Sequence, residues 1–267
     1  MCNGIVIKTA EEIEKMRVAG RLAADVLEMI EPHVKAGVTT RELDDICHKY
    51  ITEVQGAIPA PLNYHGFPKS ICTSINHVVC HGIPNDDEVL KDGDIINLDI
   101  TVIKDGYHGD TSKMFLIGDV SLEDRRLCRV TQESLYAAIR KVKPGATVGD
   151  LGSTIQKHIK NSNARYSIVR DYCGHGIGAE FHEEPQVVHY KNNDRTVLKP
   201  GMCFTIEPMI NAGKFTTELN DEDGWTVYTA DRKKSAQYEH TILVTDNGCE
   251  VLTLRAEEDF PRHVVSK

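Results

Sequence analysis

The chain has 267 residues, of which 40% are hydrophobic and 27% charged, which is enough for one large domain with a full core. Its formal net charge of -9 argues against a general affinity for DNA, RNA or anionic lipid, and Arg232-Lys233-Lys234 is interpreted as a solvated turn rather than an RNA contact. Eight cysteines occur without an apolar signal segment, and no apolar stretch approaches the roughly 20 residues that span a bilayer, so we expect a cytoplasmic protein with free thiols.

The N-terminal part of the chain predicts two amphipathic helices. Apolar residues recur at helical spacing from Ile13 to Ile30, behind a capping box formed by Thr9 and Glu12. A second helix begins near Thr39, and its apolar face comprises Leu43, Ile46, Cys47, Tyr50 and Val54. Each helix is expected to lay its apolar stripe against a core.

Two further helices follow past the middle of the chain. One starts at about Ser121 and is closed by Pro144 and Gly145. The next is opened by Thr147 and Asp150. The order helix, connector, helix is the same as at the N-terminus.

Two sequence matches indicate an internal repeat. Val34-Lys35-Ala36-Gly37 corresponds to Val142-Lys143-Pro144-Gly145, at an offset of 142 minus 34, or 108. Leu90-Lys91-Asp92-Gly93, with Asp99 after it, corresponds at the same offset to Leu198-Lys199-Pro200-Gly201, with Glu207 after it. We therefore predict one catalytic domain over residues 1–267, built from two copies of an αα-plus-antiparallel-sheet unit at roughly 9–117 and 121–250, with a site between them.

The strand around Asp99 shows period-two alternation. Along residues 96–102 one face is apolar and the other carries Asp99. Lys104-Asp105-Gly106 forms a hairpin turn, and the return strand contains Asp110. The hairpin therefore brings two carboxylates near each other.

The register of this hairpin decides whether the carboxylates share a face. If Ile103 pairs with Tyr107, they fall on opposite faces of a regular ladder. Shared metal binding then requires a β-bulge, with Gly106 or Gly109 supplying the unusual backbone angles. We predict such a bulge, and an unbroken regular ladder here would count against the shared site.

Five residues with metal-binding side chains occur in strand or turn contexts: Asp99, Asp110, His175, Glu207 and Glu239. Singly none is informative, because a surface carboxylate is usually just solvated. The neighbours of Asp99, Glu207 and Glu239 are those of core strands, and an unpaired charge in a core is very costly. Since no lysines lie nearby in sequence to neutralise all the carboxylates, a divalent metal site is the simplest interpretation.

The donor set fits a pair of ions. Four carboxylates and one imidazole suit manganese, iron(II), cobalt or zinc, and carboxylates can bridge two ions about 3.5–4 Å apart. Such a pair polarises a carbonyl group and generates hydroxide near neutral pH. This is the chemistry of amide hydrolysis.

Other local patterns admit different chemistry. The glycine-rich segment 173–178 lets the backbone turn sharply at His175, but it lacks the Lys-Ser/Thr of a phosphate-binding P-loop. Cys72, His77, Cys80 and His81 lack the paired Cys-x-x-Cys spacing of a structural zinc site. A cysteine nucleophile activated by His81 is a further alternative, but it leaves the buried carboxylates unexplained.

Six segments closely resemble the motifs of the type I methionine aminopeptidase family, in its bacterial form. They are residues 64–72, 76–84, 105–112, 172–178, 181–185 and 235–241. The resemblance covers nearly the whole chain, which begins almost directly with catalytic-domain residues and shows no zinc-binding N-terminal extension. It implies the α+β pita-bread fold, with two pseudo-symmetric αβ halves around a curved antiparallel sheet.

The resemblance also implies a dinuclear metallo-exopeptidase. In this family metal-bound hydroxide attacks the first peptide bond of a nascent protein and releases its N-terminal methionine, with a preference for a small second residue. Asp110 and Glu239 would bridge the ions, Asp99 would complete one, and His175 and Glu207 the other. The two ions would be drawn from cobalt, manganese, iron(II), zinc and nickel.

The remaining site residues are also implied by the resemblance. His81 and His182 would hold the substrate and the tetrahedral intermediate, and Glu207 would shuttle a proton. The methionine pocket would comprise Tyr64, Phe67, Cys72, Tyr172, Phe181 and Trp225. Core packing is the alternative for these aromatic residues, above all for Trp225, and Pro61 and Phe67 depart from the cysteine and tyrosine common in bacterial relatives.

Further partners follow from the same resemblance. A monovalent cation, Na⁺ or K⁺, would bind backbone carbonyls near Asn76, Val78 and Ser235. Contact with the ribosome near the exit tunnel and a monomeric state are expected. Since Cys2 is small, the protein is expected to remove its own Met1.

Three rival functions remain open from the sequence. A proline-specific aminopeptidase would share the five ligands but would normally carry a large additional N-terminal domain. A non-catalytic binding protein, associated with the ribosome or RNA, would keep the fold without turnover. A metal-dependent phosphoesterase would need arginines near the site, and none lies within the motifs.

Overall fold

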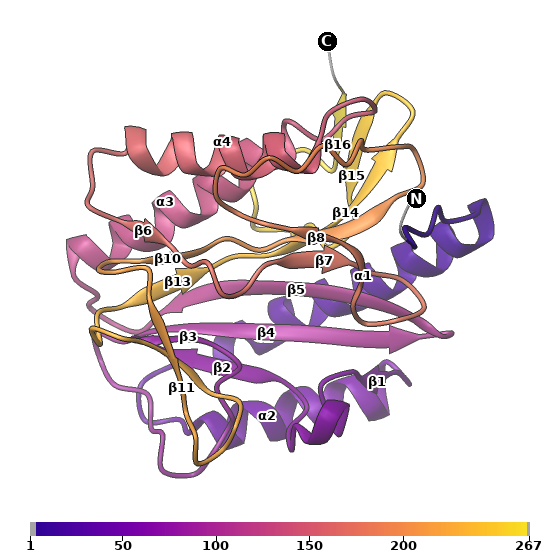
Figure 1. The fold of residues 1–267 in the computed structure, drawn as a ribbon. Helices are drawn as coiled ribbons and strands as arrows, with labels where there is room; N and C mark the ends of the chain where they lie inside the picture. The colour runs from indigo at the N-terminus through magenta and orange to yellow at the C-terminus, as the bar shows by residue number, and fades with distance from the viewer. Residues whose placement is uncertain (1–3, 266–267) are drawn as a thin grey trace.

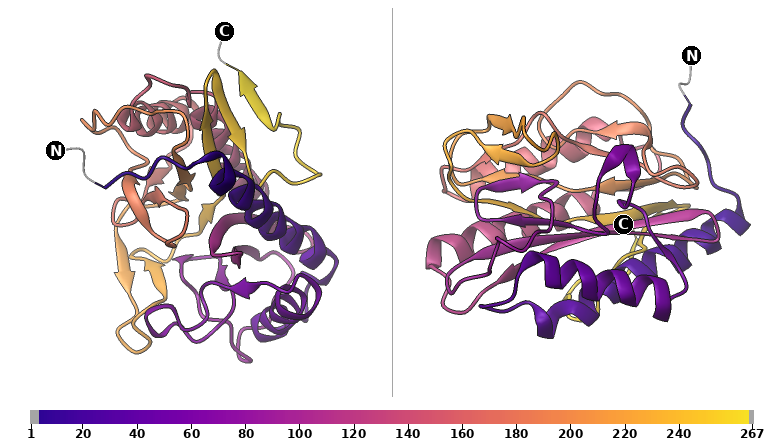
Figure 2. Two further views of the ribbon diagram at one scale, coloured as in Figure 1. Left: turned by 90° about the vertical axis from the view of Figure 1, so that its right-hand side faces the viewer. Right: turned by 90° about the horizontal axis from the view of Figure 1, so that it is seen from below.

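Helices on the outside of the molecule enclose the strands (Figure 1). The computed structural model describes residues 4–265. In the N-terminal half α1 (Ala10–Ile30) and α2 (Thr40–Lys49) pack against the strands, and in the C-terminal half α3 (Leu122–Ile139) and α4 (Val148–Asn161) do so. Figure 2 shows from two other directions that the helices of the two halves lie on different sides of the strands.

The strands of the described residues form four antiparallel sheets. In the N-terminal half β4 (Ile95–Lys104) pairs with β5 (Tyr107–Leu116), β1 (Ile58–Pro59) and β2 (Cys72–Ile75). The C-terminal half holds, in spatial order, β16 (His263–Val265), β15 (Gly248–Val251), β14 (His240–Thr245), β9 (Cys203–Ile206), β7 (Gly174–Gly176) and β8 (Glu183–Val187). The two smaller sheets are β13 (Ser235–Gln237), β10 (Met209–Asn211) and β6 (Ser167–Ile168), and β11 (Thr217–Leu219), β12 (Val227–Thr229) and β3 (Val78–Cys80).

The predicted helix starts are confirmed. Capping boxes open three helices: Thr9 with Glu12 at α1, Thr39 with Glu42 at α2, and Thr147 with Asp150 at α4. Ser121 caps α3 by accepting a hydrogen bond from the backbone N–H of Asp124. The expected apolar face of α2 is wrong at its end, where the chain continues as the π-helical turn η2 (Tyr50–Val54). This turn rotates later side chains off the stripe and leaves Val54 67% exposed.

Two isolated β-bridges occupy equivalent places in the two halves. Thr39 pairs with Val89, and Thr147 pairs with Val197, so both partners are shifted by 108 residues, as 147 minus 39 and 197 minus 89. The same offset relates two backbone hydrogen bonds, from Gly37 N–H to the Leu90 carbonyl and from Gly145 N–H to the Leu198 carbonyl. Equal connections at one offset support the proposal that a single domain was built by duplication.

The β4–β5 hairpin has a different register from the one expected. Lys104 pairs with Tyr107, the ladder continues without interruption to Ile95 and Leu116, and the turn consists of Asp105 and Gly106 alone. Both turn residues have positive φ, 50° and 80°, as a two-residue hairpin turn requires. The predicted bulge and the pairing of Ile103 with Tyr107 are therefore both wrong.

The true register places the two carboxylates on one face without a bulge. Asp110 lies directly opposite Thr101, and Thr101 shares its face with Asp99 because they are two residues apart on one strand. The unbroken ladder thus no longer counts against a shared site. Asp99 in turn lies opposite Ser112, whose other neighbour is Glu239 in an isolated bridge between the halves.

Both faces of β4 are buried, although the sequence indicates one apolar and one polar face. The apolar face packs under α1 and α2, and Ile96, Leu98 and Ile100 are completely inaccessible. On the polar face Asn97 is 3% exposed, and its side-chain amide donates to the Gln237 carbonyl of the C-terminal half. The C-terminal half therefore covers the face that carries the carboxylates.

Gly109 is required for helix packing and not for a bulge. A Cβ atom at this position would lie 2.3 Å from the backbone carbonyl carbon of Ala19 and 2.4 Å from the backbone nitrogen of Gly20, both in α1. Helix α1 can therefore lie on β5 only where the strand has no side chain.

No helix within residues 4–265 is long and apolar enough to cross a membrane.

We expect the substitution Gly109→Ala to destabilise the protein by about 3 kcal/mol, because backbone atoms on both sides cannot move away from the added methyl group. Chemical denaturation of the metal-free protein measures this loss. The control Gly106→Asn lies in the same hairpin with open space around it, and it should change the unfolding free energy by less than about 1 kcal/mol. Equal stability of Gly109→Ala and wild type would contradict the packing argument.

Candidate metal centre

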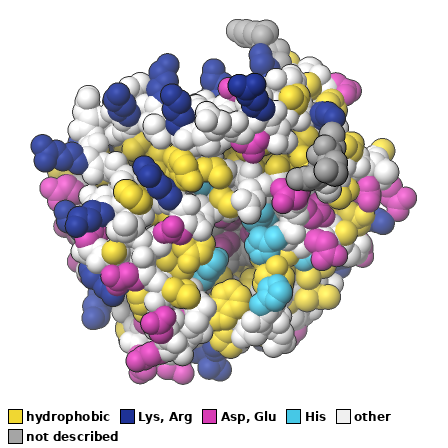
Figure 3. All heavy atoms as spheres, viewed as in Figure 1, with side chains coloured by type: hydrophobic (Ala, Val, Ile, Leu, Met, Phe, Trp, Pro, Cys, Tyr) yellow, Lys and Arg dark blue, Asp and Glu magenta, His cyan; other side chains and the backbone are white. Residues whose placement is uncertain are grey.

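One cavity of about 280 Å³ collects the predicted metal-binding side chains. Strands β4, β5 and β7 supply Asp99, Asp110 and His175. Glu207 follows β9 directly, and Glu239 lies between β13 and β14. The cavity opens on the face shown in Figure 3, with histidines at its rim and acidic side chains inside.

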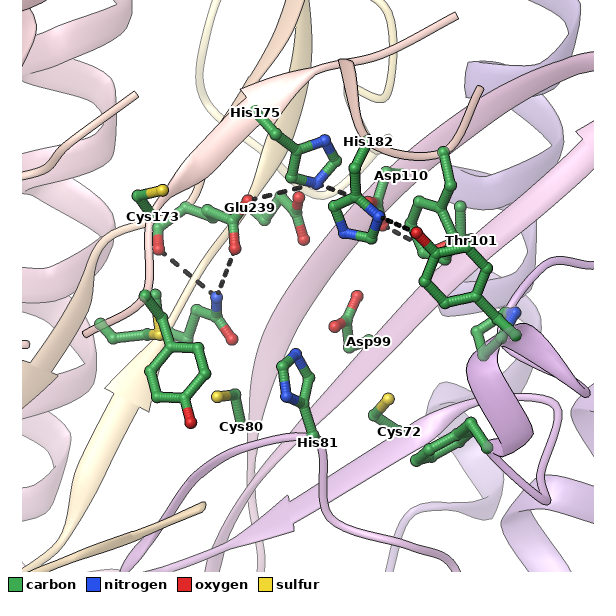
Figure 4. Close-up of a pocket in the computed structure, with 18 of the residues that line it drawn as sticks. Cys72, Cys80, His81, Asp99, Thr101, Asp110, Cys173, His175, His182 and Glu239 are labelled. Atoms are coloured by element: carbon green, nitrogen blue, oxygen red, sulfur yellow. Dashed lines mark hydrogen bonds and ion pairs between the residues drawn. The ribbon is translucent and has the colours of Figure 1, made fainter. Parts of the chain in front are cut away.

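Three of these residues form a compact cluster. Ligand atoms of Asp110, His175 and Glu239 all lie within 4.8 Å of one another. His175 Nε2 is 3.6 Å from Asp110 Oδ2 and also 3.6 Å from Glu207 Oε1. Asp99, on the same face of the β4–β5 hairpin as Asp110, points into the same space (Figure 4). All five candidates are therefore brought to one site, with Asp99 and Glu207 flanking the compact cluster.

Hydrogen bonds fix the orientation of these side chains. Thr101 Oγ1 donates to Asp110 Oδ1 at 2.8 Å, and Thr205 Oγ1 donates to Glu207 Oε1 at 2.7 Å. His175 Nδ1 lies 2.9 Å from the Gly176 carbonyl, which can only accept. Nδ1 must therefore carry the hydrogen, and the Nε2 lone pair faces the carboxylates as metal ligation requires.

The electrostatics show that the cluster is poorly neutralised by the protein alone. Burial, followed by repulsion from neighbouring carboxylates, raises the pKa values of Asp99 and Glu239 well above their usual range. Burial also raises the pKa of Glu207 to about 7, although the nearby His175 opposes the shift. For His175 burial disfavours the cation, but the contact with Asp110 and the charge of Glu207 outweigh it and raise its pKa.

Two orphaned oxygen atoms test whether a metal fits. Asp99 Oδ1 and Glu239 Oε1 are buried without any hydrogen-bond partner among the described residues. Buried carboxylate oxygens nearly always have a donor or a cation beside them. Oxygen donors from four carboxylates together with one imidazole nitrogen form a suitable donor set for divalent ions. The residues present therefore fit a metal centre.

Two further histidines border the cavity. Burial lowers the pKa of His81 to about 4. Removal from water, followed by the neighbouring imidazole of His175, lowers the pKa of His182 to about 4 as well. Both are therefore neutral at pH 7. Tyr64 Oη lies 2.8 Å from His182 Nδ1.

The six residues expected to form the methionine pocket all line this cavity: Tyr64, Phe67, Cys72, Tyr172, Phe181 and Trp225. Trp225 contacts Phe67 edge-on at 5.3 Å between ring centroids, and it meets His81 at 6.1 Å. It therefore belongs to the cavity wall, which argues against the alternative of simple core packing. Pro61 also lines the cavity.

Lys8, which precedes α1, contacts the loop that carries Phe181 and His182. The Lys8 ammonium, whose side chain is 2% exposed, forms an ion pair with Glu183. The Lys8 backbone N–H donates to the Gly201 carbonyl. Since Glu183 directly follows His182, this buried contact limits how far the imidazole can move.

Sequence reasoning missed several residues of the cavity: Cys80, Thr101, Asp171, Cys173, Met209 and Gln237. Two of them carried a usable signal. Thr101 is two residues from Asp99, and Gln237 is two residues from Glu239, so strand alternation could have placed them beside these carboxylates. Gln237 Nε2 donates to Glu207 Oε2 at 3.2 Å.

The rival sites do not assemble. His77 stacks on Tyr228 at 5.5 Å and does not line the cavity with Cys72, Cys80 and His81, so a zinc knuckle is not formed. Burial raises the pKa values of the Cys72 and Cys80 thiols well above their usual range, which disfavours a nucleophilic thiolate. The glycine-rich segment forms β7, which pairs with β8 and β9.

The residues expected around a monovalent cation lie near one another. The Ser235 backbone N–H donates to the Asn76 carbonyl at 2.8 Å, and Asn76 adopts a positive φ of 51°. Val78 pairs with Tyr228 in the β3–β12 ladder. The cation site itself stays a prediction.

Comparison with known proteins agrees with this geometry. The model of metallopeptidase family M24 matches residues 14–246. A methionine aminopeptidase of Escherichia coli (strain K12) is 64% identical over 258 residues, and the match covers 96% of this chain and 97% of that relative. A match over nearly the full length of both proteins leaves no large additional domain in that relative.

Solved structures show the same fold. The methionine aminopeptidase of Rickettsia prowazekii superposes with a TM-score of 0.90 at 56% identity, over 94% of this chain and 100% of that chain. A prolidase from Pyrococcus furiosus has a TM-score of 0.73 at 26% identity, and the match covers 94% of this chain but 66% of the prolidase. The predicted α+β pita-bread fold class is thereby confirmed.

Metal binding should release protons, because the raised pKa values of Asp99 and Glu239 keep protons on the metal-free cluster. Because burial raises the pKa of Glu207 to about 7 in the metal-free protein, we expect at least a fraction of a proton per protein to be released at pH 7. Carboxyl groups whose folded pKa is raised stabilise the metal-free fold at low pH, and this stability is lost as pH rises toward and through those values. Bound metal should therefore raise the melting temperature more at pH 8 than at pH 6.

Calorimetric titration with Mn²⁺ in two buffers of different ionisation enthalpy measures the number of protons released. Asp99→Asn removes one titrating carboxyl group and should reduce that number. A heat of binding that does not depend on the buffer would contradict the assignment.

Proposed function

The chain belongs to metallopeptidase family M24, and on that premise we propose that it is a methionine aminopeptidase, which removes the N-terminal methionine from newly made polypeptides. One observation supports this function above the others. All thirteen residues expected to bind metal, activate the peptide or hold the methionine line a single cavity. This shared lining supports a metallopeptidase centre with a pocket for an apolar side chain beside it.

We assign the metal ligands as the resemblance implies. Asp110 and Glu239 would be shared by two divalent ions, Asp99 would help to hold one ion, and His175 and Glu207 would help to hold the other. When bound, such a pair of ions polarises the scissile carbonyl and supplies hydroxide near neutral pH. Cobalt, manganese, iron(II), zinc and nickel all suit these donors, so the ion used in the cell depends on availability.

The two neutral histidines are assigned to the substrate. His182 Nδ1 lies 2.8 Å from the Tyr64 hydroxyl. We assign the tautomer in which Nδ1 accepts from this hydroxyl, so that Nε2 carries the hydrogen and can donate to the oxygen that becomes negative as the carbonyl is attacked. His81 sits across the cavity, edge-on to Tyr172 and Trp225, and is assigned to hold the peptide. Neutral N–H donors stabilise developing charge without attracting other anions.

Glu207 is assigned to proton transfer. In the metal-free protein burial raises its pKa to about 7, so this carboxyl group holds a proton more readily than an exposed one. Thr205 and Gln237 each donate to a different oxygen of its carboxyl group, which fixes the direction of the remaining lone pairs. In this position Glu207 takes a proton from the attacking water and returns it to the amine nitrogen that leaves.

The proposed partner is the N-terminus of a nascent chain. A ribosome contact, a monomeric state and a cytoplasmic location stay predictions, the last supported by the seven free cysteines within residues 4–265. Arg232 pairs with Glu218, and Lys234 pairs with Asp124. The basic turn therefore offers little free charge to RNA. Met1 and Cys2 lie outside the described residues, so removal of Met1 also stays a prediction.

Specific observations disfavour the rival enzymes. The matched methionine aminopeptidases are covered over 97% and 100% of their length, whereas the prolidase is covered over 66%. A phosphoesterase would need cationic side chains at the phosphate, and none of the described residues that line the cavity is arginine or lysine. An activity assay separates these enzymes from each other and from a non-catalytic binding protein.

The proposed activity predicts hydrolysis of Met-Ala-Ser by chelator-stripped protein only after Co²⁺ or Mn²⁺ is added. Asp110→Ala and His175→Ala should each lower kcat/KM by about 100-fold or more, because even the loss of a residue that only orients a ligand costs 10- to 100-fold. The control Asp86→Ala removes a carboxylate that is 80% exposed and should be neutral. Released methionine is measured by chromatography.

The outcomes separate the candidate functions. Cleavage of Ala-Pro in preference to Met-Ala-Ser would favour a proline-specific enzyme. No release with any metal, from protein shown to be folded and metal-loaded, would leave the binding-protein alternative.

A further inference from the structure

We propose that Arg255 is a positioning residue of the metal centre, which holds the backbone of Asp110 and Glu239 through a ring of hydrogen bonds closed by the peptide bond between Asp110 and Thr111, and which thereby sets the affinity for divalent ions. The inference rests on the proposed function, since it takes these two residues as the bridging ligands. It concerns residues behind the cavity that neither bind metal nor touch substrate.

Arg255 is a buried cation, and each of its three guanidinium nitrogen atoms has a partner. Its side chain is 1% exposed. Nε donates to Glu257 at 3.1 Å, Nη2 contacts Glu258 at 3.1 Å, and Nη1 donates to Thr111 Oγ1 at 2.9 Å. A planar fork can serve three partners at fixed angles, which a lysine ammonium cannot reproduce.

The first arm of the ring leads to Glu239. Thr111 Oγ1, which accepts from Arg255, donates in turn to the Glu239 backbone carbonyl at 2.7 Å. Thr111 directly follows Asp110 in β5, and its side chain is completely inaccessible. One hydroxyl group therefore links the guanidinium to the backbone beside both bridging ligands.

The second arm leads to Asp110 by way of β14. Glu258 contacts His240 Nε2 at 3.0 Å, and His240 Nδ1 contacts Thr253 Oγ1 at 2.9 Å. Thr253 Oγ1 then accepts from the Thr241 backbone N–H at 3.1 Å. Thr241 Oγ1 completes the arm by donating to the Asp110 carbonyl at 2.8 Å. Thr241 Oγ1 also accepts from the Asp110 backbone N–H at 3.1 Å. Both backbone polar groups of Asp110 are thus held by one residue of this arm.

The ring explains how the two bridging ligands keep a fixed separation. Asp110 and Glu239 come from different halves of the chain, and the isolated β-bridge between Ser112 and Glu239 is the one ladder contact between their backbones among the described residues. Because this backbone connection is short, side-chain contacts must determine how Asp110 and Glu239 lie relative to each other. The ring provides such contacts on the side away from the cavity. Arg255 joins its two arms, because it contacts both Thr111 and Glu258.

Arg255 does not belong to the catalytic cavity. It lines a separate cavity of about 360 Å³ together with Lys113, Tyr136 and Glu258. It therefore acts through other residues, and its loss should change metal affinity rather than recognition of methionine. Groups that orient metal ligands typically contribute 10- to 100-fold in affinity.

The test measures Mn²⁺ affinity directly, by electron paramagnetic resonance of free Mn²⁺ titrated into chelator-stripped protein. Arg255→Met should weaken binding 10- to 100-fold, and Arg255→Lys should recover only part of the loss. KM for Met-Ala-Ser at saturating Mn²⁺ should stay within about 2-fold of wild type, because the methionine pocket is untouched.

Lys113→Met is the matched control. Lys113 is buried, lines the same cavity and pairs with Glu257, but it lies outside the ring. Its loss should change Mn²⁺ affinity by less than about 3-fold. Thr111→Val keeps the shape of the side chain and breaks only the arm to Glu239, so it tests the same idea if Arg255→Met does not fold, and it should weaken binding about 10-fold.

Folded Arg255→Met or Thr111→Val protein with wild-type affinity would overturn the inference, as would an equal loss in Lys113→Met. Wild-type protein that binds Mn²⁺ and shows the expected variant pattern, but releases no methionine, would refute the proposed activity and support the inference. The two claims can therefore fail separately.

Discussion

Four carboxylates and one imidazole lie together in one cavity, with Asp110, His175 and Glu239 buried and Asp99 and Glu207 partly buried. The rest of the structure depends on offsetting the repulsion between these carboxylates. Asp99 and Glu239 each keep an oxygen atom without a hydrogen-bond partner among the described residues, and burial raises the pKa values of both. In the absence of cations such a cluster opposes folding unless it holds protons. Divalent ions remove this cost and at the same time provide the chemistry of peptide hydrolysis.

The fold brings the carboxylates together from two similar halves. Each half contributes an αα pair over antiparallel strands, and the two halves face each other with the carboxylate-bearing faces inward. The regular β4–β5 ladder sets Asp99 and Asp110 on one face, and the bridge from Ser112 to Glu239 adds a carboxylate from the other half. Hydrogen-bonded neighbours such as Thr101 then fix how each carboxylate points.

Much of this could be predicted from the sequence because the relevant signals are local. Capping boxes and apolar spacing gave the helices, and motif order indicated the family and the site residues. Register was not local. A change of one residue in the length of the hairpin turn changes which side chains of the two strands share a face. We expected a three-residue turn from the sequence, which required a bulge that the two-residue turn makes unnecessary. Long-range contacts left no pattern either: the packing of α1 on Gly109 and the ring through Arg255 join residues more than 80 positions apart.

The central claim is that the cluster is a two-ion centre. Anomalous diffraction from crystals soaked in Mn²⁺ or Co²⁺ tests it most directly, because it locates ions without reference to activity. The account predicts two peaks about 3.5–4 Å apart, with Asp110 and Glu239 between them, Asp99 at one peak and His175 with Glu207 at the other. A single strong peak away from these side chains, or an empty cluster at saturating metal, would contradict it.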